Sequence, residues 1–320
     1  MSTASANDIL TKTQISIADA ISVHGQSNVK FLYGAKFMDK SIDCRKMFED
    51  GPRIAEARYL DYDDIKSSTP DNLPHMMPEA SLQSAAMDAM DIKDTDHVIL
   101  YGPNNCMFVF RTYMQMRIMG HPKELCHLLD GSLEEWIAAG GPTEEAGSTP
   151  TYPLIEAANI GAGASANYKA TEAKNIVTMG DLKTWIEEGK TAGENPDVLV
   201  VDARPNARFT GSAAEPRPGM RGGHMPGAIN LPITEFLDPS NKVRMKPKKE
   251  LEQILNNAGI SLPLDPSDGK KIVSSCGSGV TACAMLTALD ILDQDTSNVY
   301  LYDGSWTEWG SNPDTPIEKD

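Results

Sequence analysis

The chain carries one seven-residue pattern twice, and this duplication constrains its fold more than any other feature of the sequence. Residues 130–136 and 303–309 both read D-G-S-x-x-E-W, and each copy follows an apolar stretch that is typical of a β-strand. The copies lie roughly 170 residues apart in a chain of 320 residues. A repeat of this length predicts two similar domains, each large enough to bury its own core.

Three further pairs of segments match in the same order along the two halves: residues 31–35 with 200–203, residues 53–57 with 224–228, and residues 98–102 with 272–276. Strand-like stretches such as 198–201 alternate with helical stretches such as 248–258, which predicts a parallel sheet covered by helices. We therefore expect an α/β protein with two tandem domains. Their predicted limits are residues 1–145 and 174–320, with a linker at 146–173 that is rich in small residues and proline.

A cysteine follows the strand pattern in the carboxyl-terminal copy. Residues 271–275 form a short apolar strand pattern, Cys276 comes next, and the loop 277–281 leads into a helical run at 282–292. The N–H groups of such a loop can converge on the sulfur, and the positive end of the helix dipole favours negative charge there. Two glycines and two hydroxyl residues in five positions exceed what a plain connection needs. We therefore interpret Cys276 as a reactive thiolate rather than a buried structural cysteine.

The amino-terminal copy lacks this cysteine. Gly102 stands at the position that matches Cys276, and Gly34 is aligned with Asp202. Cys106 lies four residues further along the corresponding loop, and we interpret it as a packed thiol. The amino-terminal copy is therefore predicted to be catalytically inactive.

The loop after Cys276 also differs from the loops that bind phosphate. A Walker loop has a lysine before its Ser or Thr, and this loop has none. A phosphatase of the Cys-x5-Arg type needs an arginine at position 282, where this chain has Ala282. The loop therefore suits a small soft anion, or a sulfur atom carried on Cys276.

Composition narrows the classes of partner and compartment. A formal net charge of −16 argues against general binding to nucleic acids or anionic membranes, and we interpret the basic run at 242–249 as a solvated loop that leads into a helix. Five cysteines without CxxC spacing indicate neither a disulfide framework nor a zinc site. No apolar stretch of about 18 residues occurs, so no segment is expected to span a membrane. We expect a cytoplasmic location, with a mitochondrial one as the alternative, although no presequence is evident.

The cysteine loop, residues 276–282, resembles the active-site loop of the tandem-rhodanese sulfurtransferases. This resemblance implies two rhodanese-like domains, each a small parallel sheet flanked by helices, and an enzyme that needs neither a metal nor an organic cofactor. The carboxyl-terminal half carries further matching segments at 201–204, 207–209, 215–219, 223–230 and 301–309. The amino-terminal half matches more loosely, at 57–63, 74–78, 120–121 and 128–131.

The second and third loop residues distinguish two branches of that family. Thiosulfate-specific members resemble Cys-Arg-Lys-Gly and present two cations to a dianion, whereas Gly277 and Ser278 offer backbone donors and one hydroxyl. This pattern favours 3-mercaptopyruvate, a monoanionic keto-thiol, as the sulfur donor. A thiosulfate:cyanide sulfurtransferase and a persulfide carrier with little free turnover are the alternatives.

The resemblance also implies the roles of individual residues. It places the substrate-binding arginines at Arg208 and Arg217, whose guanidinium groups suit a carboxylate and a carbonyl oxygen. A Ser-His-Asp relay falls on Ser278, His75 and Asp63, in which the histidine transfers a proton near neutral pH. Other carboxylates compete with Asp63 for the role of orienting His75, namely Asp61, Asp64 and Asp71. The loop residues expected to bind the transferred sulfur are Gly277, Gly279, Val280 and Thr281.

The implied reaction has two steps. The Cys276 thiolate takes the sulfur of 3-mercaptopyruvate to form a persulfide and releases pyruvate. A small thiol, thioredoxin or cyanide then removes the outer sulfur, and transfer to a thiol allows hydrogen sulfide to form. This interpretation requires a sulfur at position 276 that is ionised and reachable.

Overall fold

A computed structural model of the chain describes residues 6–39, 41–152, 154–155, 160 and 167–319. The chain divides into two compact units. Unit 1 comprises residues 1–67, 77–174 and 238–245, and unit 2 comprises residues 68–76, 175–237 and 246–320. The expected linker at 146–173 falls within unit 1, and its residues 153, 156–159 and 161–166 lie outside the described part. The domain limits predicted from the sequence stay a prediction.

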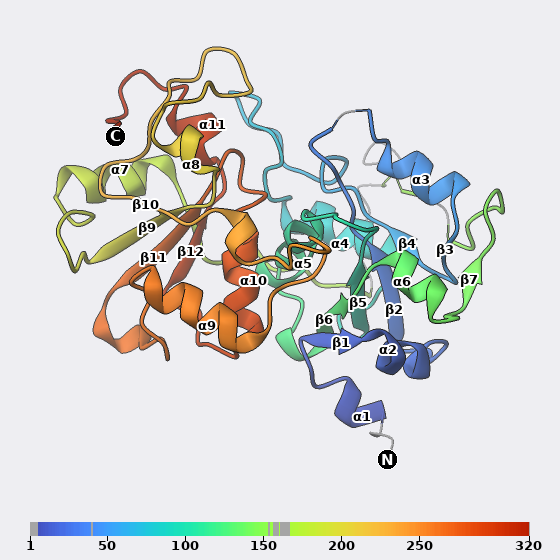
Figure 1. Ribbon diagram of the computed structural model, residues 1–320. Coiled ribbons are helices and arrows are strands. Elements are labelled where there is room, and N and C mark those ends of the chain that lie inside the picture. Colours follow the sequence, from blue (N-terminus) through green and yellow to red (C-terminus); the bar gives the residue numbers. More distant parts are fainter. Residues whose placement is uncertain (1–5, 40, 153, 156–159, 161–166, 320) are drawn as a thin grey trace. The chain divides into compact units, whose positions relative to one another are not determined.

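Unit 1 contains a five-stranded parallel sheet in the order β1-β6-β5-β2-β4 (Figure 1). Its strands are β1 (Gln14–Ser16), β2 (Val29–Tyr33), β4 (Arg58–Tyr59), β5 (His97–Tyr101) and β6 (Cys126–Asp130). Strands β3 (Arg53–Ile54) and β7 (Thr143–Glu144) form a separate antiparallel pair. The helices are α1 (Ala6–Ile9), α2 (Ile17–Val23), α3 (Cys44–Asp50), α4 (Ala80–Ala89), α5 (Val109–Ile118), the 3-10 helix η1 (Lys123–Leu125) and α6 (Leu133–Ala138).

Unit 2 contains a second five-stranded parallel sheet, in the order β10-β9-β11-β12-β8. Its strands are β8 (Ile176–Val177), β9 (Val198–Asp202), β10 (Ile229–Asn230), β11 (Lys271–Ser275) and β12 (Val299–Tyr302). Its helices are α7 (Met179–Glu187), α8 (Asn206–Phe209), α9 (Lys248–Asn257), α10 (Cys283–Ile291) and α11 (Ser305–Trp309), with 3-10 helices η3 (Ile233–Glu235) and η4 (Pro266–Asp268). In the part of the chain described, no helix is both long and apolar enough to cross a membrane.

The two sheets share one topology, which confirms the predicted duplication of an α/β fold. Reading the first sheet from β4 to β1 and the second from β10 to β8 gives the same chain order. The hydrogen bonds correct one detail of the predicted alignment. Leu60 N donates to Tyr33 O at 3.0 Å, as Leu231 N donates to Asp202 O at 3.0 Å, so Tyr33 rather than Gly34 is the counterpart of Asp202.

The match between Gly102 and Cys276 is confirmed by the same kind of bond. Leu133 N donates to Gly102 O at 2.9 Å, and Trp306 N donates to Cys276 O at 3.0 Å. In both units the first turn of the helix after the D-G-S pattern therefore binds the carbonyl oxygen at the start of the loop. This fixes the residue-by-residue correspondence between the two loops.

Each unit includes one short segment from the other half of the sequence. Residues 68–76, between β4 and α4, group with unit 2, and residues 238–245, between β10 and α9, group with unit 1. Because β4 and β10 are equivalent edge strands, the two segments hold equivalent places in the repeat. This exchange assigns His75 to the same unit as Cys276.

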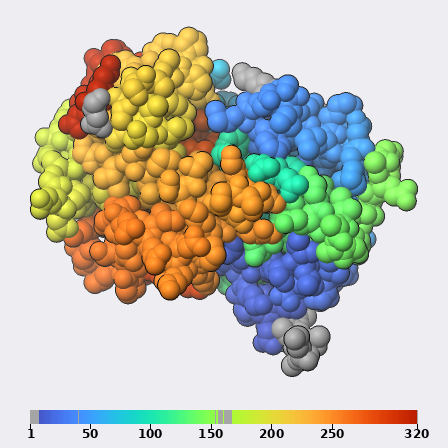
Figure 2. Space-filling view, viewed as in Figure 1, coloured from blue at the N-terminus to red at the C-terminus, as the bar shows by residue number. Residues whose placement is uncertain are grey.

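The exchanged segment of unit 1 changes the interpretation of the basic run at 242–249. Arg244 Nε donates to Asp130 Oδ1 at 3.0 Å, and its Nη2 donates to Glu135 at 3.1 Å. The expectation of a wholly solvated loop is therefore wrong for Arg244, which binds the Asp and the Glu of the first D-G-S-x-x-E-W copy. The rest of the expectation holds, because helix α9 begins at Lys248, and its orange side chains lie on the outer surface of unit 2 (Figure 2).

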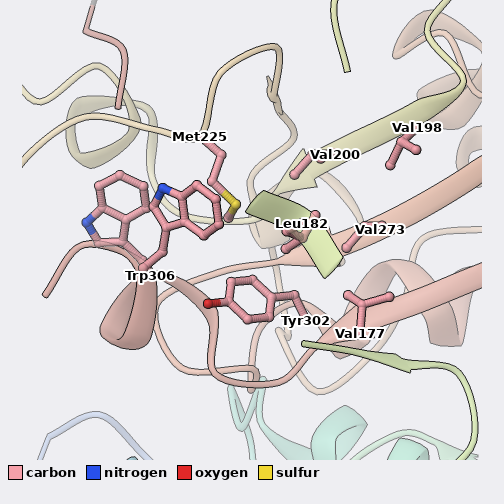
Figure 3. Packing of buried hydrophobic residues seen from close by; sticks show 9 residues of the cluster. Val177, Leu182, Val198, Val200, Met225, Val273, Tyr302 and Trp306 are labelled. Carbon is pink, nitrogen blue, oxygen red and sulfur yellow. The ribbon is translucent and has the colours of Figure 1, made fainter. Parts of the chain in front are cut away.

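The core of unit 2 explains how the end of its sheet is held. Val198, Val200, Val273 and Tyr302 lie on one face and pack against Trp306 and other residues of α7 and α11 (Figure 3). Because side chains alternate along a strand, Ser274 faces the opposite side, where its Oγ donates to Ala282 O at 2.9 Å, just before α10. Helices on both faces thus fix the ends of β9, β11 and β12.

Unit 1 contains two buried histidines that are held neutral. His127 donates from Nδ1 to Lys12 O at 2.6 Å, so its Nε2 accepts from His97 Nδ1 at 2.9 Å. His121 lies with Nε2 at 3.1 Å from Asp96 O, and burial is the main cause that lowers the pKa of both His121 and His127 to about 4.

These two histidines predict that unit 1 loses stability in mild acid. Below pH 6.5, the ordinary histidine pKa, the unfolded chain binds protons that the buried rings do not bind until about pH 4. As the pH drops from about 6.5 to about 4, the free energy of unfolding should therefore decrease, by up to about 3 kcal/mol for each histidine. Hydrogen exchange of β6 at pH 7 and pH 5, corrected for intrinsic rates and referenced to β11, measures the effect. A His121→Gln/His127→Gln double variant should lose most of this pH dependence, and an unchanged dependence would exclude these two rings as its source.

Candidate active site

Cys276 is the first residue after β11, at the edge of the unit 2 sheet where the parallel strands end. This edge is where α/β proteins bind their ligands. The loop 276–282 links β11 to α10, which begins at Cys283. The sequence interpretation required a sulfur that a donor can reach. Cys276 is only 1% exposed, so its sulfur is covered in this structure.

The hydroxyl of Ser305 holds the loop through hydrogen bonds to its backbone. Ser305 Oγ accepts hydrogen bonds from Cys276 N at 3.1 Å and from Gly279 N at 3.0 Å, and it donates to Tyr302 O at 2.7 Å. Ser305 is fully buried and has a φ of 51°, an unusual value for a residue with a Cβ. One side chain therefore ties the first and fourth loop residues to the end of β12.

The first turn of α11 holds the carbonyl side of the loop. Trp306 N donates to Cys276 O at 3.0 Å, and Thr307 N donates to Gly277 O at 2.9 Å. Thr307 Oγ1 also donates to Gly277 O, at 2.5 Å. Because these carbonyl groups are bound from outside the loop, they point away from its N–H groups.

Four N–H groups of the loop remain available. Within the described residues, the N–H groups of Gly277, Ser278, Val280 and Thr281 donate to no other residue. Free N–H groups before a helix form a common binding site for anions. The cradle stays a prediction, and the N–H of Gly279 does not contribute to it in this structure because it is bound to Ser305 Oγ.

Arg208 belongs to a buried chain of alternating charges. Arg204 donates from Nε to Asp202 Oδ2 at 2.9 Å and from Nη1 to Glu215 Oε1 at 2.8 Å. Glu215 Oε2 in turn pairs with Arg208, whose Nε lies 3.1 Å away. Buried charges of this kind are stable only when each has a partner, and the four groups meet that condition. The chain holds the Arg208 side chain, which is 17% exposed, at the active-site loop.

Arg208 lies directly against Gly277. A Cβ atom added at position 277 would sit 3.1 Å from Arg208 Nη2, closer than an unstrained contact. A larger residue at 277 would therefore have to displace the guanidinium group. The glycine at 277 and the position of the Arg208 guanidinium group therefore depend on each other.

Arg217 is held by a different kind of partner. Its Nη1 donates to Thr307 Oγ1 at 3.2 Å. In the ranges described, no carboxylate forms an ion pair with Arg217. Among the described residues, its charge is therefore not compensated by a carboxylate.

The Ser-His-Asp relay stays a prediction, and two of its three members lie in unit 2. Ser278 and His75 belong to unit 2, and His75 has a φ of 59°. Among the described residues the Ser278 hydroxyl has no hydrogen-bond partner, so no bond from Ser278 to His75 is present. The relay stays a prediction that requires a rearrangement of these side chains.

The carboxylate partner of His75 stays a prediction as well. Asp63 belongs to unit 1, where it shares Lys36 with Asp61, and Lys36 Nζ lies 3.0 Å from Asp61 Oδ1. The other carboxylates considered for this role are Asp64, which pairs with Arg45 in unit 1, and Asp71, which belongs to unit 2 with His75.

Comparisons with known proteins agree with this geometry. A family model described as "Rhodanese-like domain" matches residues 178–312. The chain is 34% identical to "Thiosulfate/3-mercaptopyruvate sulfurtransferase 1, mitochondrial" of Arabidopsis thaliana, over 83% of this chain and 67% of the relative. It is 33% identical to the 3-mercaptopyruvate sulfurtransferase of Escherichia coli K12, over 83% of both chains. The chain belongs to the 3-mercaptopyruvate sulfurtransferase family.

Solved structures of this family share the fold. The Tum1 protein of Saccharomyces cerevisiae matches with a TM-score of 0.76 and 26% identity, over 97% of this chain and 99% of that chain. The 3-mercaptopyruvate sulfurtransferase SseA of Escherichia coli matches with a TM-score of 0.71 and 26% identity, over 92% of this chain and 99% of that chain. The protein is thus a sulfurtransferase enzyme with two domains of rhodanese type.

Other thiols of this sulfurtransferase are packed. Cys283 Sγ donates to Gly279 O at 3.3 Å and is fully buried. Burial raises the pKa of Cys106, and burial with the nearby Cys106 raises the pKa of Cys44 to about 12, so both thiolates are disfavoured. In the part of the chain that is described, no cluster of three or more His, Cys, Asp or Glu side chains could hold a metal ion.

Four residues that support the site were not predicted from the sequence. Ser305 and Thr307 lie in the second D-G-S-x-x-E-W copy, and Arg204 and Glu215 lie in segments that match the family. The repeated pattern was a usable signal for the first two, because it marks the turn that contacts the loop in both units. Nothing in the sequence indicated that Glu215 joins Arg204 to Arg208.

The role of Ser305 predicts a large effect of removing its hydroxyl. Ser305→Gly suits the positive φ but leaves two buried N–H groups without an acceptor, each at a cost of about 1–3 kcal/mol. We expect its sulfurtransferase kcat/KM to fall at least about tenfold. Ser132→Gly is the matched control, because Ser132 is the counterpart in unit 1 and only caps α6. Equal losses in the two variants would contradict the assigned role.

Proposed function

We propose that this enzyme transfers sulfur from 3-mercaptopyruvate to thiol acceptors through a persulfide on Cys276. The observation that carries the proposal is the set of four N–H groups, in the loop that follows Cys276, that donate to no other described residue. Arg208 and Arg217 supply two cations at the same loop, and the relatives named above are sulfurtransferases for this donor. The site thus combines a nucleophile, an anion cradle and a keto-acid clamp.

The first step forms the persulfide. The Cys276 thiolate attacks the donor sulfur, the sulfur–sulfur bond forms, and the carbon–sulfur bond breaks. The electron pair of the broken bond passes to the carbon fragment as the enolate of pyruvate, which then takes up a proton. Arg208 and Arg217 bind the carboxylate and the carbonyl oxygen and offset the developing negative charge. In this proposal Ser278, His75 and Asp63 deliver the proton once their side chains come together.

The second step returns the thiolate. An acceptor thiolate attacks the outer sulfur, the persulfide bond breaks, and its electron pair returns to Cys276. Small thiols or thioredoxin would carry the sulfur away as their own persulfide, and attack by a second thiol would release hydrogen sulfide and leave a disulfide. Cyanide would accept the same sulfur as thiocyanate. The free N–H groups at 277, 278, 280 and 281 stabilise the persulfide anion between the two steps.

The amino-terminal unit supplies no nucleophile in this proposal, although Asp63 of the proposed relay belongs to it. Gly102 stands where Cys276 stands in unit 2, and burial disfavours the thiolate of Cys106. A cytoplasmic location is part of the proposal, and mitochondria are the alternative, because one Arabidopsis relative is described as mitochondrial.

Thiosulfate is a second candidate donor. The name of the Arabidopsis relative includes both donors, although Gly277 and Ser278 lack the two cations that suit a dianion. We expect kcat/KM to be higher with 3-mercaptopyruvate than with thiosulfate under the same conditions. The reverse order would make the protein a thiosulfate sulfurtransferase. A persulfide that small thiols remove slowly would instead identify a carrier.

The nucleophile assignment predicts a mass change at one cysteine. After incubation with 3-mercaptopyruvate, the wild type should gain about 32 Da on the peptide that contains Cys276. Cys276→Ser should lose this gain and the production of pyruvate, and Cys283→Ser should retain both. Because Cys276 is covered in the structure, the same measurement tests whether the donor gains access. Absence of the adduct in the wild type would end the proposal.

The clamp predicts a binding defect when Arg208 is removed. Arg208→Ala should raise KM for 3-mercaptopyruvate about tenfold, because a charge-assisted hydrogen bond to the donor is lost. Lys183→Ala is a suitable control, since Lys183 is an exposed cation of α7 in the same unit. If both variants keep the wild-type KM, Arg208 does not bind the donor.

A further inference from the structure

The hydroxyl of Thr307 joins the active-site loop to Arg217. It lies 2.5 Å from Gly277 O and 3.2 Å from Arg217 Nη1. A carbonyl oxygen only accepts and a guanidinium group only donates, so the hydroxyl must donate to Gly277 and accept from Arg217. The direction of this chain of hydrogen bonds is therefore fixed, and each bond polarises the next.

The two arginines of the site are held in different ways. Glu215 holds Arg208 and neutralises its charge. Thr307 is neutral, so it holds Arg217 without reducing the attraction of that arginine for an anion. Its backbone N–H also donates to Gly277 O, which ties its position to the loop that carries Cys276.

The inactive copy uses the equivalent position in the opposite way. The register of the two loops makes Glu134 the counterpart of Thr307 and Asn104 the counterpart of Ser278. Glu134 Oε2 accepts a hydrogen bond from Asn104 N at 2.8 Å. In unit 1 the N–H group at this loop position is therefore bound to a carboxylate of the protein. In unit 2 the equivalent N–H group, that of Ser278, has no acceptor among the described residues.

We propose that Thr307 is a positioning residue that places Arg217 for the donor carboxylate and, being short and neutral, leaves the Ser278 N–H group free for the donor. This inference rests on the proposed function and adds a specificity determinant to the same site. It also explains how one repeat can keep an anion cradle open while the other fills it with its own side chain.

Four variants separate this role from a structural one. Thr307→Val keeps the shape of the side chain but loses both hydrogen bonds, and we expect KM for 3-mercaptopyruvate to rise about fivefold with kcat changed less than about twofold. Thr307→Ser should restore KM to within about twofold of the wild type. Thr307→Glu should reproduce the arrangement of unit 1 and lower kcat/KM by about a hundredfold or more. In an Arg217→Ala background, Thr307→Val should have no further effect on KM.

Pyruvate provides a readout that does not depend on turnover. It should protect Cys276 of the wild type from iodoacetamide, and Thr307→Val should need about fivefold more pyruvate for the same protection. If the wild type forms no persulfide from 3-mercaptopyruvate, the proposed function fails, and this protection assay still decides the role of Thr307. Equal protection of the wild type and Thr307→Val, or a Thr307→Val effect that persists without Arg217, overturns the inference. Circular dichroism and melting temperature confirm that each variant is folded.

Discussion

Holding the carbonyl groups of the cysteine loop away from its own N–H groups is the constraint on which this active site depends. A loop can bind an anion through its backbone only while its N–H groups have no internal acceptor. In unit 2 the first turn of α11 binds the carbonyl oxygens of Cys276 and Gly277, and Ser305 fixes the other end of the loop to β12. As a result, four N–H groups of the loop have no acceptor among the described residues. Ser305 is fully buried, and its hydroxyl holds the loop in place through hydrogen bonds with four groups, from Ser275, Cys276, Gly279 and Tyr302.

The two units share one scaffold but differ in whether a protein carboxylate binds an N–H group of the loop. Both sheets have the same strand order, and both D-G-S patterns bind the start of the neighbouring loop. The difference lies in single side chains: Cys276 is replaced by Gly102, and Thr307 is replaced by Glu134. In unit 1 the Glu134 carboxylate accepts a hydrogen bond from Asn104 N, so this N–H group does not carry the cost of an unsatisfied donor.

Local sequence signals were sufficient for the fold, and the assignment of Cys276 as the nucleophile stays a prediction. The strand at 271–275 and the helix near 248 were predicted within a residue, because apolar runs and a preceding proline mark them directly. Features that depend on distant parts of the chain were less accessible. The pairing of Gly34 with Asp202 was wrong by one residue, since register is set by hydrogen bonds between strands. Arg204 and Glu215 are eleven residues apart and meet only through tertiary packing, and the burial of Cys276 is likewise a property of the folded unit.

The reciprocal exchange of segments restricts how this architecture can evolve. A polypeptide of residues 175–320 alone would contain the nucleophile but lack residues 68–76, and residues 1–174 alone would lack 238–245. Each half of the gene therefore encodes a part that completes the other half. If either half were deleted or replaced by an unrelated domain, the remaining unit would lack the segment that the other half supplies. The amino-terminal half of the sequence thus supplies residues 68–76 to the unit that contains Cys276.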